Sequence, residues 1–208
     1  MRAFIGLILG LSLIGLTSCS TGKEDAGRNN RFSQSPFSTT YIDKLSLVKV
    51  SSIVVLDAKW SQEASACRDH FNVDKKVDQA FRAESRINII EDSKDSSSSQ
   101  INEVVARNKA DAALGLSLVR CVERLGSSFG ATEAAQVGFL LNLYNPSGKV
   151  IWTGTFSMKD QAIFDNLFTA GEKLKVGTGW VTASQIMDHG LTLAAREFEN
   201  QRVGLYLN

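Results

Sequence analysis

The stretch Val50-Ser-Ser-Ile-Val-Val-Leu56 decides the fold of this chain. It is short, apolar and rich in β-branched residues, with no polar residue between Ile53 and Leu56. A run of this kind is typical of a β-strand that is buried on both of its faces. We expect it to be the first strand of a folded part that begins near Tyr41.

A helix and a second strand follow this run. Asn72 is suited to cap a helix whose first turn holds Asp74. The apolar residues behind the cap recur at helical spacing, at Val73, Val77, Ala80 and Phe81. Arg86-Ile-Asn-Ile-Ile90 then predicts the second strand.

A second helix and a third strand complete a repeating pattern. Ser97 and Gln100 have the spacing of a capping box, and a single apolar helical face follows them, made of Ile101, Val104 and Val105. Ala112 to Val122 predicts a third, longer strand. The order β-α-β-α-β predicts parallel strands with right-handed crossovers, and a 2-1-3 strand order would place the first and third strands side by side.

The pattern changes after the third strand. Val137 to Tyr144 and Val150 to Phe156 predict two strands, and Asn145-Pro-Ser-Gly-Lys149 between them suits a type I turn, so we expect an antiparallel hairpin. Thr182 with Gln185 is another capping-box pair. The helix that they open has one apolar face, made of Ile186, Met187, Gly190, Leu191, Ala194, Ala195 and Phe198. Gly190 in that face suggests a close approach to the sheet. The predicted fold is a single α/β domain over residues 41–208, with a mixed sheet and a C-terminal helix.

The amino terminus has the layout of a secretory signal. Arg2 precedes an uncharged run from Ala3 to Leu16, and small residues then lead into Cys19. Leu16-Thr17-Ser18-Cys19 resembles the lipobox of bacterial lipoproteins. The resemblance implies removal of residues 1–18, diacylglyceryl transfer to Cys19 and acylation of the new amino terminus, with palmitate as the expected acyl chain. The alternative is an ordinary signal peptide in which Cys19 is incidental.

The residues after Cys19 predict a tether. Residues 19–40 are mostly polar or charged and cannot bury enough apolar surface to order themselves. Ser20 stands where aspartate would be the usual inner-membrane retention signal, so the family rule favours the outer membrane, with the domain facing the periplasm. The formal net charge of +1 argues against a non-specific nucleic-acid binder.

The order of elements resembles a group of periplasmic lipoprotein domains. A β-α-β-α-β unit, then a hairpin with Gly148-Lys-Val-Ile-Trp152, behind a lipobox and a tether, is similar to the LpoB-type activators of peptidoglycan synthases, the curli-secretion lipoprotein CsgG and relatives of the TolB amino-terminal domain. The resemblance covers roughly Leu47 to Phe156. It implies a lipoprotein of the cell envelope. The chain lacks an obvious long amphipathic hairpin of the curli-secretion type, which argues against pore formation.

Two cysteines remain once Cys19 carries lipid. Cys67 follows the carboxyl end of the first strand, and Cys121 lies near that of the third. In the 2-1-3 order these ends are neighbours. The two cysteines could therefore form a disulfide in the oxidising periplasm, and the alternative is a pair of reduced thiols.

Nothing in the sequence assembles a catalytic or metal site, and we expect neither an enzyme nor a cofactor. His70 and His189 show no spacing with other ligands that a zinc site would need. Ser46-Leu-Val-Lys49 matches Ser-x-x-Lys, but it precedes a strand and its partner motifs are missing.

Two segments are candidates for binding a partner. Glu123 to Gln136 is long for a hairpin connection and predicts either an extended twisted hairpin or a functional loop. Its candidate contact residues are Glu123, Arg124, Gly126, Phe129 and Gly130. Asp160 to Trp180 reads as an amphipathic helix and a turn packed on the sheet, but an exposed Phe168 or Trp180 would be an anchor for a protein partner.

These observations predict a membrane-anchored adaptor or activator of an envelope protein or of the cell wall. The first alternative is a structural component of a secretion or flagellar assembly, in which the chain would form a homo-oligomer. A hydrolase with an unrecognised site is the third hypothesis.

Overall fold

A computed structural model describes residues 36–70, 72–90, 100–127, 130–159 and 181–204. All of them belong to the second of two compact units, residues 32–208. In this part of the chain, no helix is both long enough and apolar enough to cross a membrane. The helices and strands, in chain order, are β1 (Phe37–Tyr41), α1 (Lys44–Val48), β2 (Ser52–Val55), β3 (Lys59–Trp60), the 3₁₀ helix η1 (Gln62–Cys67), α2 (Val73–Glu84), β4 (Asn88–Ile90), α3 (Ile101–Asn108), β5 (Ala112–Val122), β6 (Leu125–Ser127), β7 (Gly130–Glu133), β8 (Gln136–Tyr144), β9 (Val150–Lys159) and α5 (Ala183–Gly204).

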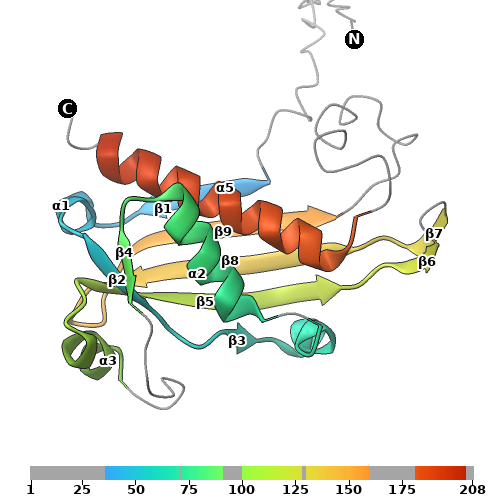
Figure 1. Cartoon of the computed structure of the whole chain (residues 1–208), viewed down its shortest axis with the longest axis horizontal. Coiled ribbons are helices and arrows are strands. Elements are labelled where there is room, and N and C mark those ends of the chain that lie inside the picture. Colours follow the sequence, from blue (N-terminus) through green and yellow to red (C-terminus); the bar gives the residue numbers. More distant parts are fainter. Residues whose placement is uncertain (1–35, 71, 91–99, 128–129, 160–180, 205–208) are drawn as a thin grey trace, which may run out of the picture. The chain divides into compact units, whose positions relative to one another are not determined.

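One mixed sheet organises the unit, in the order β1-β9-β8-β5-β2-β4, with β3 paired to β5 (Figure 1). The pairs β2–β4 and β2–β5 are parallel, and the pairs β5–β8, β8–β9 and β1–β9 are antiparallel. β2 therefore lies between β4 and β5, which is the predicted 2-1-3 order. The expected α/β domain with a mixed sheet and a C-terminal helix is confirmed.

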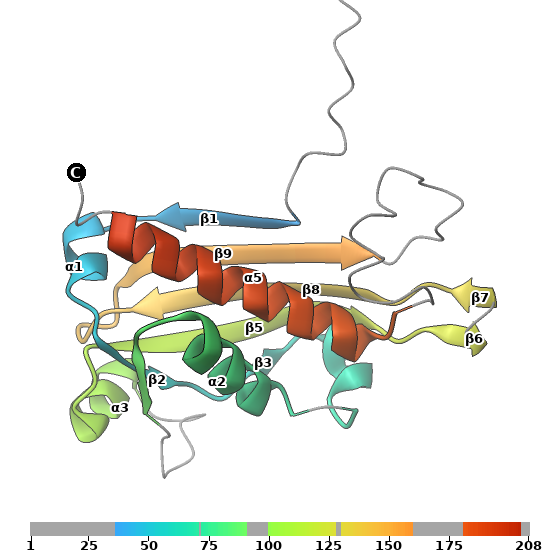
Figure 2. The same cartoon turned by 45° about the horizontal axis from the view of Figure 1, so that its top comes forward.

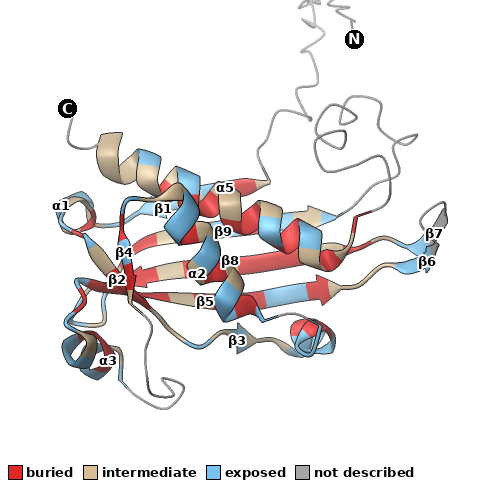
Figure 3. Cartoon of the chain, viewed as in Figure 1, coloured by how far each residue is buried: buried red, intermediate tan, exposed pale blue. Residues whose placement is uncertain are grey.

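The main core lies between the sheet and the two helices α2 and α5, which lie side by side (Figures 1 and 3). Phe81 of α2 and Phe198 of α5 meet with ring centroids 5.8 Å apart, and Trp152 of β9 meets Phe198 edge to face at 5.3 Å. Gly190 lets α5 approach the sheet, since a Cβ atom there would lie 2.8 Å from Cε1 of Phe156. The close approach predicted for this glycine is confirmed.

A smaller core lies on the opposite face of the sheet. Ile53 belongs to the main core and its neighbour Val54 to the smaller one, so β2 is buried on both faces as its sequence predicts. α3 covers Val54 and Ala113 there with Val104 and Val105.

Two of the three helix caps predicted from the sequence are observed. The Asn72 side chain accepts from the backbone N–H of Lys75 at 2.9 Å. Thr182 and Gln185 form the reciprocal capping box, since Gln185 N–H donates to Thr182 Oγ1 and Thr182 N–H donates to Gln185 Oε1. At α3 the expected Ser97–Gln100 box is wrong, because Gln100 is itself the N-cap and makes no side-chain cap bond. Ser97 lies outside the described residues.

The turn between β8 and β9 lies where the sequence predicts it. Gly148 N–H donates to the carbonyl oxygen of Asn145 at 2.9 Å, and Gly148 has a φ of +79°. β8 and β9 form the predicted antiparallel hairpin.

The folded part begins earlier than the sequence predicts. β1 occupies Phe37–Tyr41 at the edge of the sheet, so the predicted tether, residues 19–40, loses its last four residues to a strand. Only Phe37 in this strand is buried, and it packs on Trp152. A single buried anchor gives no periodic pattern, and pairing with β9 supplies the order that the local sequence does not.

Candidate functional site

The long connection between β5 and β8 forms an arm, described over residues 123–127 and 130–135, that projects past the ends of both strands (Figure 2). Within it, β6 and β7 pair antiparallel, with an irregular register between Leu125 and Gly126. Gly126 has a φ of +118°, a conformation that only glycine adopts readily. Of the two structures that the sequence left open, the extended hairpin is the one observed.

The base of the arm is fixed by Glu123. One carboxylate oxygen of Glu123 accepts from the backbone N–H of Arg124 at 3.0 Å and from that of Ala183 at 3.2 Å. Ala183 is the first residue of α5, so a negative charge lies at the positive end of that helix. Glu123 therefore holds the arm to α5, a structural task that the sequence did not reveal.

The arm carries an exposed apolar side chain. Leu125 is 57% exposed. Thr132 on β7 donates from its hydroxyl to the carbonyl oxygen of Leu125 at 3.2 Å, which ties the two strands across the arm. A single exposed leucine is common on protein surfaces, so Leu125 is a candidate contact residue because of its place on the projecting arm.

The other predicted contact residues divide into two groups. Arg124 and Gly130 lie on the arm within the described residues, Arg124 half-buried. Phe129, Phe168 and Trp180 lie outside them, as does the predicted helix and turn from Asp160 to Trp180. The binding role of all these residues stays a prediction.

A disulfide joins Cys67 to Cys121, with their Cα atoms 6.0 Å apart. Both residues are buried, and the bond ties η1 to the end of β5, below the arm. The end of β2 itself lies beside Leu114, well before Cys121. The two cysteines meet because β3 pairs with β5 as far as Leu118 and η1 then carries Cys67 to the end of β5.

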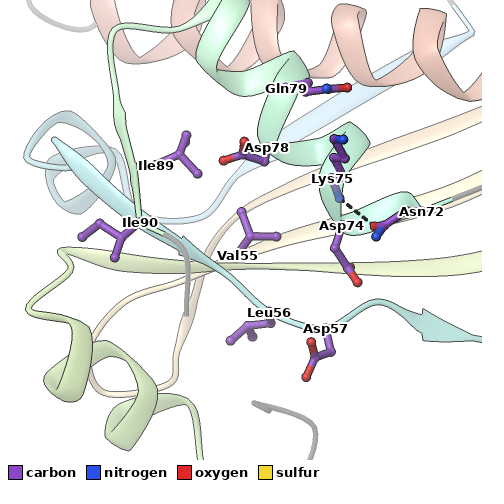
Figure 4. A pocket seen from close by; sticks show the side chains of 10 residues that line it. All are labelled: Val55, Leu56, Asp57, Asn72, Asp74, Lys75, Asp78, Gln79, Ile89 and Ile90. Carbon is purple, nitrogen blue, oxygen red and sulfur yellow. Dashed lines mark hydrogen bonds between the residues drawn. The ribbon is translucent and has the colours of Figure 1, made fainter. Parts of the chain in front are cut away.

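A cavity of about 410 Å³ opens where β2 and β4 end and α2 begins (Figure 4). In parallel α/β sheets, ligands bind at this edge, beyond the carboxyl ends of the strands. Its lining combines four aliphatic residues with six polar ones, of which three are acidic and one is a lysine. The lining residues are Val55, Leu56, Asp57, Asn72, Asp74, Lys75, Asp78, Gln79, Ile89 and Ile90.

The carboxylates of this lining have different surroundings. Asp78 is paired with Arg82, Oδ1 to Nε at 2.8 Å. Asp74 accepts from the backbone N–H of Ala58 at 3.0 Å. Burial raises the pKa of Asp74 and the nearby Asp57 carboxylate raises it further, while the bond from Ala58 acts in the opposite direction. Such a lining suits a polar ligand that carries hydroxyl or amino groups better than an anion.

A second cavity of about 390 Å³ shares Asn72 and Asp74 with the first. Trp60, Arg68 and His70 line it, and the guanidinium of Arg68 lies 5.7 Å from the centroid of the Trp60 ring. His70 is exposed and His189 half-buried. Over the described ranges, no group of three or more His, Cys, Asp and Glu side chains could hold a metal ion.

These cavities lie between segments that are distant in the sequence and were not predicted. The available signal was the pair of polar positions, Asp57 and Asn72, one just after a buried strand and the other opening the next helix. That signal is weak, since such residues also serve as ordinary turns and caps.

No protein-family model matches the sequence, and no curated protein matches it. Solved structures share the fold. The PelC dodecamer from Paraburkholderia phytofirmans superposes with a TM-score of 0.53 at 13% identity, over 78% of this chain and 97% of that chain. A point variant of that dodecamer gives 0.52 at 12% identity, over 78% and 96%. Lipoprotein GNA1162 from Neisseria meningitidis gives 0.40 at 10% identity, over 61% and 97%. The likeness to the PelC structures concerns the fold alone, because the identity is 12–13%.

Proposed function

We propose that this chain is a lipid-anchored protein of the bacterial cell envelope that binds other proteins as an adaptor or activator. The observation that carries the binding role is the arm, a hairpin held at its base by Glu123 and presenting Leu125 to solvent. The resemblance of the element order to LpoB-type activators supports the same role.

The anchor rests on the amino-terminal sequence. Removal of residues 1–18 and lipidation of Cys19 would leave a mature chain held by several acyl chains, which is enough for stable anchoring. Ser20 supports the outer membrane, with the domain in the periplasm. The change Cys19→Ala should move the protein out of the outer-membrane fraction. Unchanged fractionation would contradict the anchor.

A homo-oligomeric assembly component is the second candidate. Two of the solved structures that share this fold, with TM-scores of 0.53 and 0.52, are dodecamers of PelC. An assembly of copies of this chain would use the same arm, but between identical subunits. The hydrolase hypothesis stays third.

Crosslinking at the arm distinguishes these functions. A photoreactive amino acid at position 125 in intact cells should capture a different envelope protein if the chain is an adaptor. It should capture a second copy of the chain if the chain builds an assembly. Position 119 is the matched control, because Val119 is 50% exposed and lies on β5 outside the arm. The same products at both positions, or none at position 125, would contradict the arm as a contact surface.

The enzyme hypothesis has its own test. Replacing both His70 and His189 with alanine should leave the captured partner and the cellular effect of the chain unchanged. Loss of that effect in a folded double variant that still crosslinks would favour catalysis.

A further inference from the structure

An exposed apolar patch lies at the end of the sheet opposite the arm. We call it the α1 patch: Tyr41, Ile42 and Leu45, which are 41%, 56% and 77% exposed. Its backbone is held in place, because the N–H groups of Ile42 and Asp43 both donate to the carbonyl oxygen of Ile151. Leu47 of the same helix is fully buried, so α1 is packed on the body through one side and presents Leu45 on another. The exposure is therefore part of a fixed surface.

Lysines surround this patch. The ammonium group of Lys44 lies 4.7 Å from the centroid of the Tyr41 ring. Lys49 caps the carboxyl end of α1 and is exposed, and Lys149 of the β8–β9 turn is close enough to attract the Asp43 carboxylate. Asp43 is the N-cap of α1, and its carboxylate accepts hydrogen bonds from the backbone N–H and the hydroxyl of Ser46. The patch thus combines outward aliphatic side chains, a tyrosine and an excess of positive charge.

This combination matches the surface of an anionic bilayer. Tyrosine and lysine side chains place their apolar bodies among lipid tails and their polar ends among headgroups. Each lysine near an anionic surface adds attraction of about fivefold in affinity. A protein partner would also accept the aliphatic side chains, but the surrounding lysines favour a surface with regularly spaced phosphates.

The chain length between the anchor and the body allows this contact. Residues 20–36 separate Cys19 from β1 and span at most roughly 60 Å when fully extended. A tether of this length keeps the body near its own membrane at an effective concentration of the order of millimolar, so a weak second contact is enough.

We propose that the α1 patch docks on the anionic lipid surface to which the chain is tethered. This inference rests on the proposed lipid anchor. α1 and the arm lie at opposite ends of the sheet in both views (Figures 1 and 2). Docking through α1 directs the arm away from the bilayer, toward proteins farther from the membrane.

Two exposed leucines at opposite ends of the body give a matched test. The full chain, lipidated in cells and purified, is made with Leu45→Cys or Leu125→Cys. The introduced thiol is the only free one, since Cys19 carries lipid and Cys67 is bonded to Cys121. Each variant carries an environment-sensitive dye and is reconstituted into phosphatidylcholine vesicles with or without phosphatidylglycerol. Lipids brominated in their acyl chains then quench any dye that enters the bilayer.

We expect the dye at position 45 to be quenched at least about twofold more than the dye at position 125, and more strongly with phosphatidylglycerol. Changing Lys44, Lys49 and Lys149 together to glutamine should remove the effect of phosphatidylglycerol. The same change at three exposed lysines elsewhere, Lys59, Lys75 and Lys159, should leave the effect of phosphatidylglycerol in place.

Three outcomes would overturn the proposal. They are equal quenching at the two positions, no quenching at position 45, and disulfide crosslinking between two copies through position 45, which would make a second copy the occupant of the patch. Flotation with the vesicles reports the lipid anchor separately. A chain that floats without quenching at position 45 refutes the docking but keeps the anchor, and a chain that does not float refutes the anchor.

Discussion

Asp111 fastens the start of β2 to the start of β5. One of its carboxylate oxygens accepts from the backbone N–H and the hydroxyl of Ser51, at 3.0 and 2.6 Å, and from the same two groups of Ser52, both at 2.9 Å. Burial acts to raise the pKa of Asp111, but the bonds from the two serines together outweigh it and hold the pKa below its ordinary value. The ionised carboxylate is thus the form that stabilises the fold.

The first prediction concerns this carboxylate. Because its pKa is lower in the folded than in the unfolded chain, its contribution to stability is present above the unfolded value, near 4, and is lost as pH falls through the folded value. Asp111→Asn keeps the shape but does not titrate. We expect it to lower the free energy of unfolding by about 1 kcal/mol at pH 7, since the site is exposed and screened. Urea unfolding of both proteins at pH 7 and pH 3 measures the difference. A difference that does not shrink at pH 3 would contradict the role of the charge.

Among the elements, the position of α5 depends on one small residue. A Cβ atom at Gly190 would lie 2.8 Å from Cε1 of Phe156 and 2.9 Å from Cε1 of Phe139, and both aromatic rings are buried. Neither ring can move without disturbing the core between α5 and the sheet.

The second prediction follows from this contact. Gly190→Ala should gain about 1 kcal/mol of helix propensity but lose more through overpacking, for a net destabilisation of about 1–2 kcal/mol. Gly204→Ala is the control, because the same helix has open space around that position. Thermal unfolding of both variants measures the effect. Equal melting temperatures would mean that the helix can shift away from the sheet at no cost.

At this scale the sequence predicts elements wherever apolar residues repeat. β2, α2, β5, β8, β9 and α5 follow from buried runs, helical spacing and cap residues, and each agrees with the structure to within a few residues. The capping-box spacing at Ser97 failed because one matching pair of residues does not fix where a helix begins. β3 was not predicted, since two residues paired to a neighbour leave no pattern of their own.

The candidate sites were less predictable than the fold. The length of the 123–136 connection predicted an extended hairpin as one of two possibilities, and the hairpin is observed. The bond from the Ala183 N–H to Glu123 joins residues 60 apart in sequence, and only the folded chain reveals it. The cavities beside α2 likewise arise where separate segments meet. The α1 patch depends on exposure, which an isolated Ile42 or Leu45 in a sequence does not indicate.

At the scale of the whole molecule, one disulfide links distant segments of the chain. The disulfide between Cys67 and Cys121 spans 54 residues, from η1 to the end of β5, and encloses α2 and α3. Such a loop restricts the unfolded chain more than the folded one.

The third prediction is that replacing both cysteines with serine lowers the free energy of unfolding by about 4 kcal/mol in the chain-entropy model. Alkylation of the folded wild type without reductant should modify neither cysteine. Mass spectrometry after alkylation and urea unfolding of the double variant provide the two measurements. Ready modification of both thiols in the unreduced, folded protein would exclude the bond.

The position of β1 has a mechanical consequence. Any tension in the chain that precedes residue 36 enters the body at Phe37, on an edge strand joined to its neighbour along one side. The Phe37 ring packs beside Trp152 and directly over Gly154. A Cβ atom on Gly154 would lie 2.6 Å from Cζ of Phe37. A pull along β1 loads all its bonds to β9 at once, whereas a pull across it loads them one after another. The direction from which the load comes therefore sets how firmly the body is held.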